Sequence, residues 1–125
     1  YETVYGPIIK KNGLDFIFLV TPETTEERIR KLDELSSGFL YAVSSSSTTG
    51  SDKQIPSTEA YLKRLQSYRL KNPVLVGFGI KDKSSFDEAC AFSNGAIIGS
   101  AYIKSLENAV DINAVTASFL KMVLS

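Results

Sequence analysis

Glycines that follow short apolar runs are the residues of this sequence best suited to chemistry. Gly50, Gly79 and Gly99 each follow such a run, and Ser100 stands next to Gly99 where a helical pattern begins. In proteins with alternating strands and helices, the carboxyl ends of parallel strands share one face, and ligands bind there. Glycine has no side chain, so its backbone N–H group can approach an anion closely. The N–H groups at the start of a helix all point toward the same anion. The pattern predicts a phosphate site, with three ordinary turn glycines as the alternative.

The sequence gives little support for a nucleophilic, metal or cofactor site. The chain has no histidine, which excludes a Ser-His-Asp or Cys-His nucleophile among its 125 residues. No spacing of carboxylates or cysteines indicates a metal site, and neither a metal nor a cofactor is expected. The single cysteine, Cys90, shares an apolar helical stripe with Phe86 and Ala89, so a buried structural thiol is favoured over a reactive one. One cysteine also suits a reducing cytoplasm.

Charge and hydropathy narrow the expected partners. Fourteen basic residues balance fourteen acidic ones, so bulk charge predicts neither nucleic-acid nor anionic-membrane binding. No apolar run reaches the roughly 20 residues of a membrane span. We therefore expect a single globular α/β domain, and the helical character of its first residues hints that further residues precede Tyr1.

The elements that must hold the glycines alternate between strand and helix. Apolar runs that predict strands lie at residues 15–20, 39–43, 74–77 and 96–98, and the first has the continuous apolar character expected of a strand covered on both faces. Thr24-x-x-Glu27 and Ser85-x-x-Glu88 predict capping boxes for two helices, and residues 112–123 carry the apolar stripe of a last helix. Four βα units make either a small open sheet or half of an eight-stranded barrel. The Ser/Thr-rich residues 44–57 are expected to form a mobile lid.

Four motifs give the chain a specific resemblance. Residues 76–80 (Val-Gly-Phe-Gly-Ile) and 98–104 (Ile-Gly-Ser-Ala-Tyr-Ile-Lys) resemble the paired GFGI and GSA-(V/I)-(V/I)-K motifs of the tryptophan synthase α subunit. Residues 25–28 (Thr-Glu-Glu-Arg) and 38–44 (Gly-Phe-Leu-Tyr-Ala-Val-Ser) resemble that family between its strands 5 and 6. The resemblance implies a TIM (β/α)8 barrel, of which residues 1–125 would form the C-terminal half, strands 5 to 8 of a single domain.

The same resemblance implies a function and a set of site residues. The whole protein would be a cytoplasmic lyase of tryptophan biosynthesis that cleaves indole-3-glycerol phosphate to indole and glyceraldehyde 3-phosphate. A tryptophan synthase β subunit would receive the indole in an α2β2 complex. By motif, Gly50, Gly79, Gly99 and Ser100 would bind the phosphate, and Tyr41 would face the glycerol part as an auxiliary residue. The indole pocket would be lined by Leu19, Thr49, Phe78 and Ile97.

Two departures from the family pattern limit what this chain is expected to do alone. Where the family usually has Gly-Val-Thr-Gly, this chain has Ser47-Thr48-Thr49-Gly50. The resemblance therefore does not determine how the lid closes. The family's catalytic glutamate and aspartate belong to the first half of the barrel, and Glu23, Glu26 and Asp52 match neither. The chain alone is therefore expected to be inactive.

Its two bare sheet edges are expected to pair with the missing N-terminal half or with a second copy. The alternatives are another phosphosugar barrel, such as indole-glycerol-phosphate synthase, and a non-catalytic phosphate-binding module.

Overall fold

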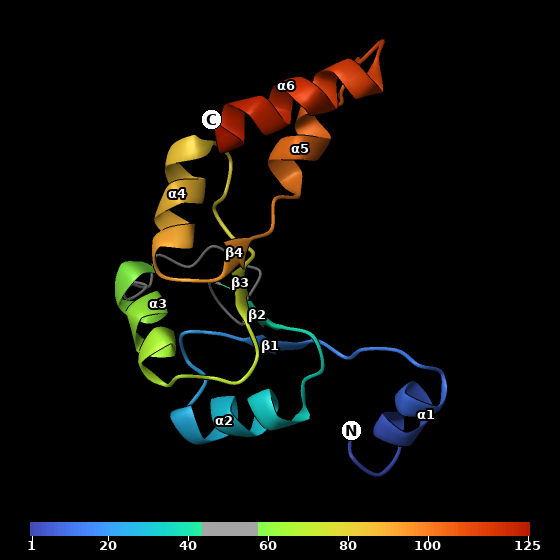
Figure 1. Ribbon diagram of the computed structural model, residues 1–125, viewed down its shortest axis with the longest axis vertical. Coiled ribbons are helices and arrows are strands. Elements are labelled where there is room, and N and C mark those ends of the chain that lie inside the picture. The colour runs from blue at the N-terminus through green and yellow to red at the C-terminus, as the bar shows by residue number, and fades with distance from the viewer. Residues whose placement is uncertain (44–57) are drawn as a thin grey trace.

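A parallel sheet with helices along one side forms the centre of the computed structural model, which describes residues 1–43 and 58–125. The four strands lie in the order in which they occur in the chain: β1 (Phe18–Val20), β2 (Leu40–Ala42), β3 (Val74–Val76) and β4 (Gly95–Ala96). The helices are α1 (Tyr5–Lys11), α2 (Glu26–Leu35), α3 (Thr58–Ser67), α4 (Lys83–Ala91), α5 (Ser100–Ser105) and α6 (Ile112–Leu124). Helices α2, α3 and α4 line one side of the sheet, α1 lies beyond β1, and α5 and α6 lie beyond β4 (Figure 1).

Within the described residues, helices cover one face of the sheet and leave the other face without a helix. Side chains alternate along each strand, and the register aligns Leu19 with Tyr41 and Tyr41 with Leu75, so these three share a face. The alternate strand residues are buried against the helices: Val20, Leu40, Ala42, Val74 and Val76. Leu19 on the opposite face is 56% exposed. The expectation that residues 15–20 form a strand covered on both faces is therefore wrong, and the open apolar face is what half a barrel leaves uncovered.

The helices complete the core with a small set of apolar side chains. Ile29 and Leu32 come from α2, Leu62 and Leu65 from α3, and Ala89 from α4. Complete burial of a side chain such as Ile29 or Leu62 stabilises the fold by about 1.5–3 kcal/mol. Burial of these residues fixes the helices against the sheet and so fixes where each strand ends.

The strands are shorter than the apolar runs that predicted them. Residues 15–17 do not pair as strand, because the backbone of Phe16 instead bonds the connection between α2 and β2. Its N–H donates to Ser37 Oγ at 3.0 Å, and its carbonyl accepts from Ser37 N at 3.2 Å. At the other edge, β4 ends at Ala96, although Ile97 N still donates to Val76 O at 2.7 Å. The number and order of strands are as predicted, and their ends are not.

Neither helix begins with the predicted capping residue. The N-cap of α2 is Thr25 rather than Thr24, and Thr25 Oγ1 accepts from Arg28 N at 3.3 Å. The N-cap of α4 is Asp82, whose carboxylate accepts from Ser85 N at 2.9 Å. Ser85 is thus the fourth residue of that capping box and not its first, because its hydroxyl bonds back to the N-cap backbone.

A buried carboxylate joins α2 to the turn that precedes β3. Asp33 accepts from Lys71 N at 2.7 Å, from Asn72 N at 2.9 Å and from Asn72 Nδ2 at 2.9 Å. Three donors compensate for taking the carboxylate out of water. The link fixes the amino-terminal edge of the sheet, opposite to the edge where the predicted site lies.

Helix α6 keeps part of its apolar stripe uncovered. Val123 is buried and Val115 and Phe119 are partly buried, whereas Ile112 and Met122 are 61% and 47% exposed. A stripe that loses part of its covering surface was expected for a half-barrel. Among the helices of the described residues, none is long and apolar enough to cross a membrane.

Candidate functional site at the carboxyl ends of the strands

The turns that follow the strands meet at one edge of the sheet. Backbone pairing continues one residue past the ends of β2 and β3: Val43 N donates to Val20 O at 2.9 Å, and Gly77 N donates to Ala42 O at 3.0 Å. Ile97 N continues the pairing of β4 with β3 in the same way. The turns at residues 77–80 and 97–100 therefore leave neighbouring strands on the same side.

Two of the predicted phosphate glycines lie on these turns with room beside them. Gly79 has a φ of +68°, a conformation that favours glycine, and a Cβ added there would meet no atom within 4 Å. A Cβ at Gly99 would also meet nothing within 4 Å. Gly99 is the N-cap of α5, and Ser100, its first residue, is exposed. No hydrogen bond joins the N–H of Gly79 or Gly99 to another described residue. Both turns can therefore admit an anion to the backbone.

Tyr41 lies flat over Gly77 at the same edge. A Cβ added at Gly77 would stand 2.1 Å from Tyr41 Cε2 and 2.3 Å from Cζ, so only glycine leaves room for the ring. Tyr41 Oη lies 3.5 Å from Gly77 O, a long contact that leaves the hydroxyl available to other partners. Sequence reasoning missed the role of Gly77. A glycine that directly follows an apolar strand signals close approach of another group.

The apolar residues predicted for the indole pocket are only partly brought together. Leu19 is aligned with Tyr41 on the open face of the sheet. Phe78 is half-buried and packs against the core cluster, and Ile97 is half-buried beside β3. Thr49 and Gly50 lie outside the residues that the structure describes, as do Ser47, Thr48 and Asp52 and the predicted lid.

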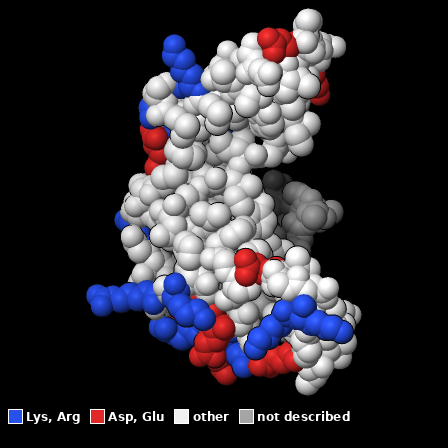
Figure 2. Space-filling view, turned by 45° about the vertical axis from the view of Figure 1, so that its right-hand side comes forward, with Lys and Arg blue, Asp and Glu red and all other residues white. Residues whose placement is uncertain are grey.

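Among the described residues, the carboxylates form no cluster at this edge. Glu26 is ion-paired with Arg30 at 2.8 Å on the exposed side of α2, and Glu23 is exposed. Within residues 1–43 and 58–125, no group of three or more His, Cys, Asp and Glu side chains could hold a metal ion. On the face of the molecule that Figure 2 shows, charged side chains gather near the two ends and almost none lie across the middle.

Two further features bear on chemistry. Cys90 is partly buried, and desolvation, with a smaller contribution from Asp87, raises the pKa of its thiol, which disfavours the nucleophilic thiolate. A cavity of about 840 Å³ lies between α1 and the end of α2, beside Leu14 and Leu35. Its lining comes from α1, the end of α2 and the connections that precede β1 and β2, so it lies at the amino-terminal edge of the sheet and is not the predicted site.

Comparison with known proteins shows which family the chain belongs to. A sequence model described as "Tryptophan synthase alpha chain" matches residues 2–123. The chain belongs to this family. The tryptophan synthase alpha chain of Christiangramia forsetii is 46% identical over 124 residues, which are 98% of this chain and 48% of that relative. That of Flavobacterium johnsoniae is 49% identical over 107 residues, covering 85% of this chain and 42% of that relative.

Solved structures of tryptophan synthase have the same fold over about half their length. The alpha subunit from Legionella pneumophila superimposes with a TM-score of 0.74 at 28% identity, over 92% of this chain and 43% of that one. A structure of the tryptophan synthase α2β2 complex from Pyrococcus furiosus gives a TM-score of 0.69 at 29% identity, over 97% and 48% of the two chains. The resemblance to the tryptophan synthase family and the prediction of about half a TIM barrel are confirmed. The chain spans about half the length of the curated relatives it matches.

Proposed function

We propose that this chain is the C-terminal half of a tryptophan synthase α-type lyase and that it binds the phosphate of indole-3-glycerol phosphate. Membership of the family, over nearly the whole chain, carries the proposal. The arrangement of Gly79 and Gly99-Ser100 on neighbouring strand ends supports it, because both turns leave backbone N–H groups accessible. The whole protein, in this proposal, is this chain together with the N-terminal barrel half.

Phosphate binding is the part of the mechanism that these residues would supply. Backbone N–H groups at the two turns, with Gly50 completing the site, would neutralise the dianion without a Lys or Arg cluster. Binding energy from the remote phosphate would then hold the reacting carbon–carbon bond in place, so that the groups around it meet a positioned substrate.

Bond cleavage would use groups from both halves of the barrel. Carboxylates of the N-terminal half would act as general acid and base on the indole ring and the glycerol hydroxyl. Tyr41, whose hydroxyl has only a long contact to Gly77 O, would face the glycerol part. Leu19, Phe78 and Ile97, with Thr49, would cover the indole ring. The products are indole and glyceraldehyde 3-phosphate, and no cofactor is needed.

The proposed protein is cytoplasmic and acts with a tryptophan synthase β subunit that receives the indole. The Pyrococcus furiosus structure described as an α2β2 complex supports this partner, because this chain shares the fold of one of its subunits. The exposed sheet face and both bare edges would be covered by the N-terminal half.

Replacement of Gly99 by valine tests the phosphate site. A Cβ at Gly99 meets nothing within 4 Å, so the G99V variant of the whole protein should fold while its side chain blocks the anion. We expect binding of glycerol 3-phosphate, measured by isothermal titration calorimetry, to be lost. The matched control is Ala91→Val on the exposed end of α4, which should bind as the unchanged protein does. Equal affinity of G99V and the control would remove the site from this turn.

A further inference from the structure

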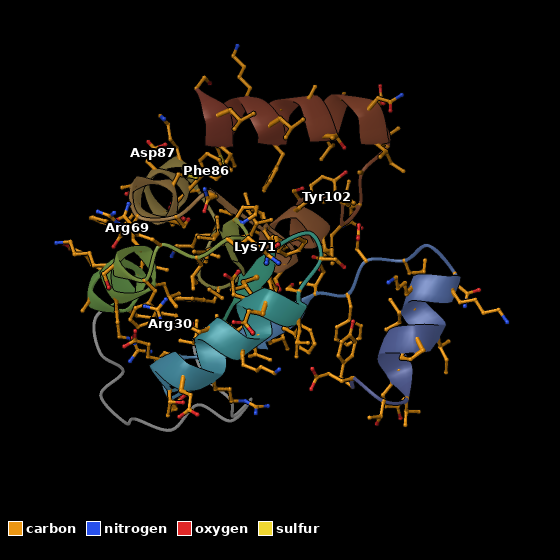
Figure 3. All side chains as sticks on the ribbon, turned by 60° about the horizontal axis from the view of Figure 1, so that its bottom comes forward. Arg30, Arg69, Lys71, Phe86, Asp87 and Tyr102 are labelled. Carbon is orange, nitrogen blue, oxygen red and sulfur yellow. The ribbon has the colours of Figure 1, made fainter. Side chains whose placement is uncertain are left out.

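One side-chain contact joins α5 to α6. Tyr102 Oη on α5 and Thr116 Oγ1 on α6 are 2.7 Å apart, a short hydrogen bond in which either hydroxyl can donate. The Tyr102 ring also packs on Phe119 of α6, with ring centroids 5.3 Å apart at 57°. Figure 3 shows Tyr102 lying between the two helices. Ring and hydroxyl together make a directional link rather than a general apolar contact.

Helix α5 has little else to hold it. It is six residues long, and Ser100 and Ile103 face solvent, Ile103 with 65% of its surface exposed. Ser105 Oγ donates to the carbonyl of Tyr102 within the same helix. In the part of the chain that the structure describes, no other side-chain hydrogen bond connects α5 to another element. A helix this short is not stable by itself, so its orientation depends on this one link.

The long helix α6 is a firm support for the link. It has 13 residues, its N-cap Asp111 accepts from Ala114 N, and Val123 near its other end is buried. Thr116 is partly buried on the face of α6 that also carries Phe119 and Val123, beside a cavity of about 410 Å³. Partial burial increases the contribution of this hydrogen bond to stability, because a hydroxyl left unpaired there is poorly solvated.

We propose that Tyr102 and Thr116 are positioning residues for the phosphate-binding turn. Their hydrogen bond fixes α5 against α6 and so holds Gly99 and Ser100, which open α5, in the orientation that binds phosphate. The inference rests on the proposed function for the identity of the ligand, and adds what sets the geometry of that site. The motif that this segment resembles has Val or Ile at the position of Tyr102, and neither could form the bond.

Hydroxyl deletions in the whole protein test the proposal. Tyr102→Phe keeps the ring on Phe119 and removes only the hydroxyl, and Thr116→Val removes its partner at nearly constant shape. Thr116→Ser restores a hydroxyl and should rescue binding. Tyr5→Phe, on the exposed helix α1, is the control for loss of a tyrosine hydroxyl elsewhere. Two quantities are measured: amide exchange rates at Ile103 and Leu106, whose N–H groups bond within α5, and the Kd for glycerol 3-phosphate.

A hydrogen bond of ordinary strength sets the expected size of the effects. Tyr102→Phe and Thr116→Val should each speed α5 amide exchange and raise Kd by about three- to tenfold, and the double variant should be no worse than either single one. In turnover assays KM should rise by a similar factor while kcat changes less, because the link acts on binding of a non-reacting group.

The outcomes separate the two proposals. Unchanged amide exchange rates in α5 of the Tyr102→Phe variant would show that the hydrogen bond does not fix α5 against α6, and would overturn the proposal. Faster exchange at an unchanged Kd would show that α5 is anchored but does not position the site, which also overturns the inference. If the unchanged protein binds no glycerol 3-phosphate, the proposed function fails, and the positioning role fails with it. Weaker binding in both hydroxyl deletions, with rescue by Thr116→Ser, supports the proposal.

Discussion

Replacing Gly77 by alanine adds one methyl group at the point where Tyr41 lies over the backbone. The new Cβ would stand 2.1 Å from Tyr41 Cε2 and 2.3 Å from both Cζ and Oη. Non-bonded carbon atoms rest at about 3.5–4.0 Å, so the ring would have to move by roughly 1.5 Å. Gly77 has no left-handed φ, and alanine therefore meets no backbone strain there. The cost is steric alone.

The size of that cost follows from how firmly Tyr41 is held. Its backbone pairs on both sides, with Leu19 and with Leu75, so β2 cannot shift to relieve the clash. The ring must change its rotamer, and overpacking of this kind costs about 1–3 kcal/mol. We expect Gly77→Ala to lower the free energy of unfolding by about 2 kcal/mol and to displace the Tyr41 hydroxyl from the site.

Urea denaturation of the whole protein measures this effect, and a double-mutant cycle assigns it. With Tyr41→Ala already in place the three atoms nearest to the added methyl are absent, so Gly77→Ala should then cost much less. Gly99→Ala is the matched control for stability, because a Cβ there meets nothing within 4 Å. Equal losses from Gly77→Ala in the presence and absence of the Tyr41 ring would refute the steric explanation.

Three further predictions concern other parts of the chain. Asp33→Ala leaves the N–H groups of Lys71 and Asn72 without their acceptor and should lower the free energy of unfolding by about 3 kcal/mol, measured in urea; a loss below about 1 kcal/mol would contradict the linking role. The hydrogen bonds from Ser85 lower the pKa of Asp82, so its cap stabilises the fold above the unfolded pKa and is lost as the pH falls through the folded pKa. Asp82→Ala should therefore lower Tm at pH 7 and begin to lose this effect as the pH falls below about 4, the ordinary pKa of an aspartate, whereas a pH-independent difference would argue against the carboxylate cap. The isolated chain should associate through its bare sheet edges in light scattering, and a monodisperse 13.7 kDa monomer that unfolds cooperatively would contradict this.

Periodicity in the sequence located the elements, because strands and helices bury side chains at different spacings. It could not locate their ends. Phe16 has the side chain of a strand residue, yet its backbone bonds Ser37, and nothing local to residues 15–20 signals this. The capping residues were displaced for a similar reason, since Thr24 and Thr25 are chemically equivalent and the preceding turn decides between them.

The place of Gly79 in a turn was predictable from the sequence, and the side-chain contacts between elements were not. The phosphate-binding roles of Gly79, Gly99 and Ser100 stay predictions. Gly79 required a positive φ, which its place after an apolar run suggested. Tyr41 lying over Gly77, Asp33 bonding Asn72 and Tyr102 bonding Thr116 each join residues distant in sequence. Such pairs leave no periodic signal, because only the completed fold brings them together. The roles assigned to Leu19, Phe78 and Ile97 stay predictions.

Indole formation from indole-3-glycerol phosphate is the most direct test of the central claim. This chain and the N-terminal barrel half of the Christiangramia forsetii relative would be produced separately and together, in a host that lacks its own tryptophan synthase. We expect neither half to release indole, since the proposed function places the phosphate site and the carboxylates on different halves, and we expect the co-produced halves to release it. Indole release by this chain alone, or no release from a stable complex of the two halves, would contradict the account.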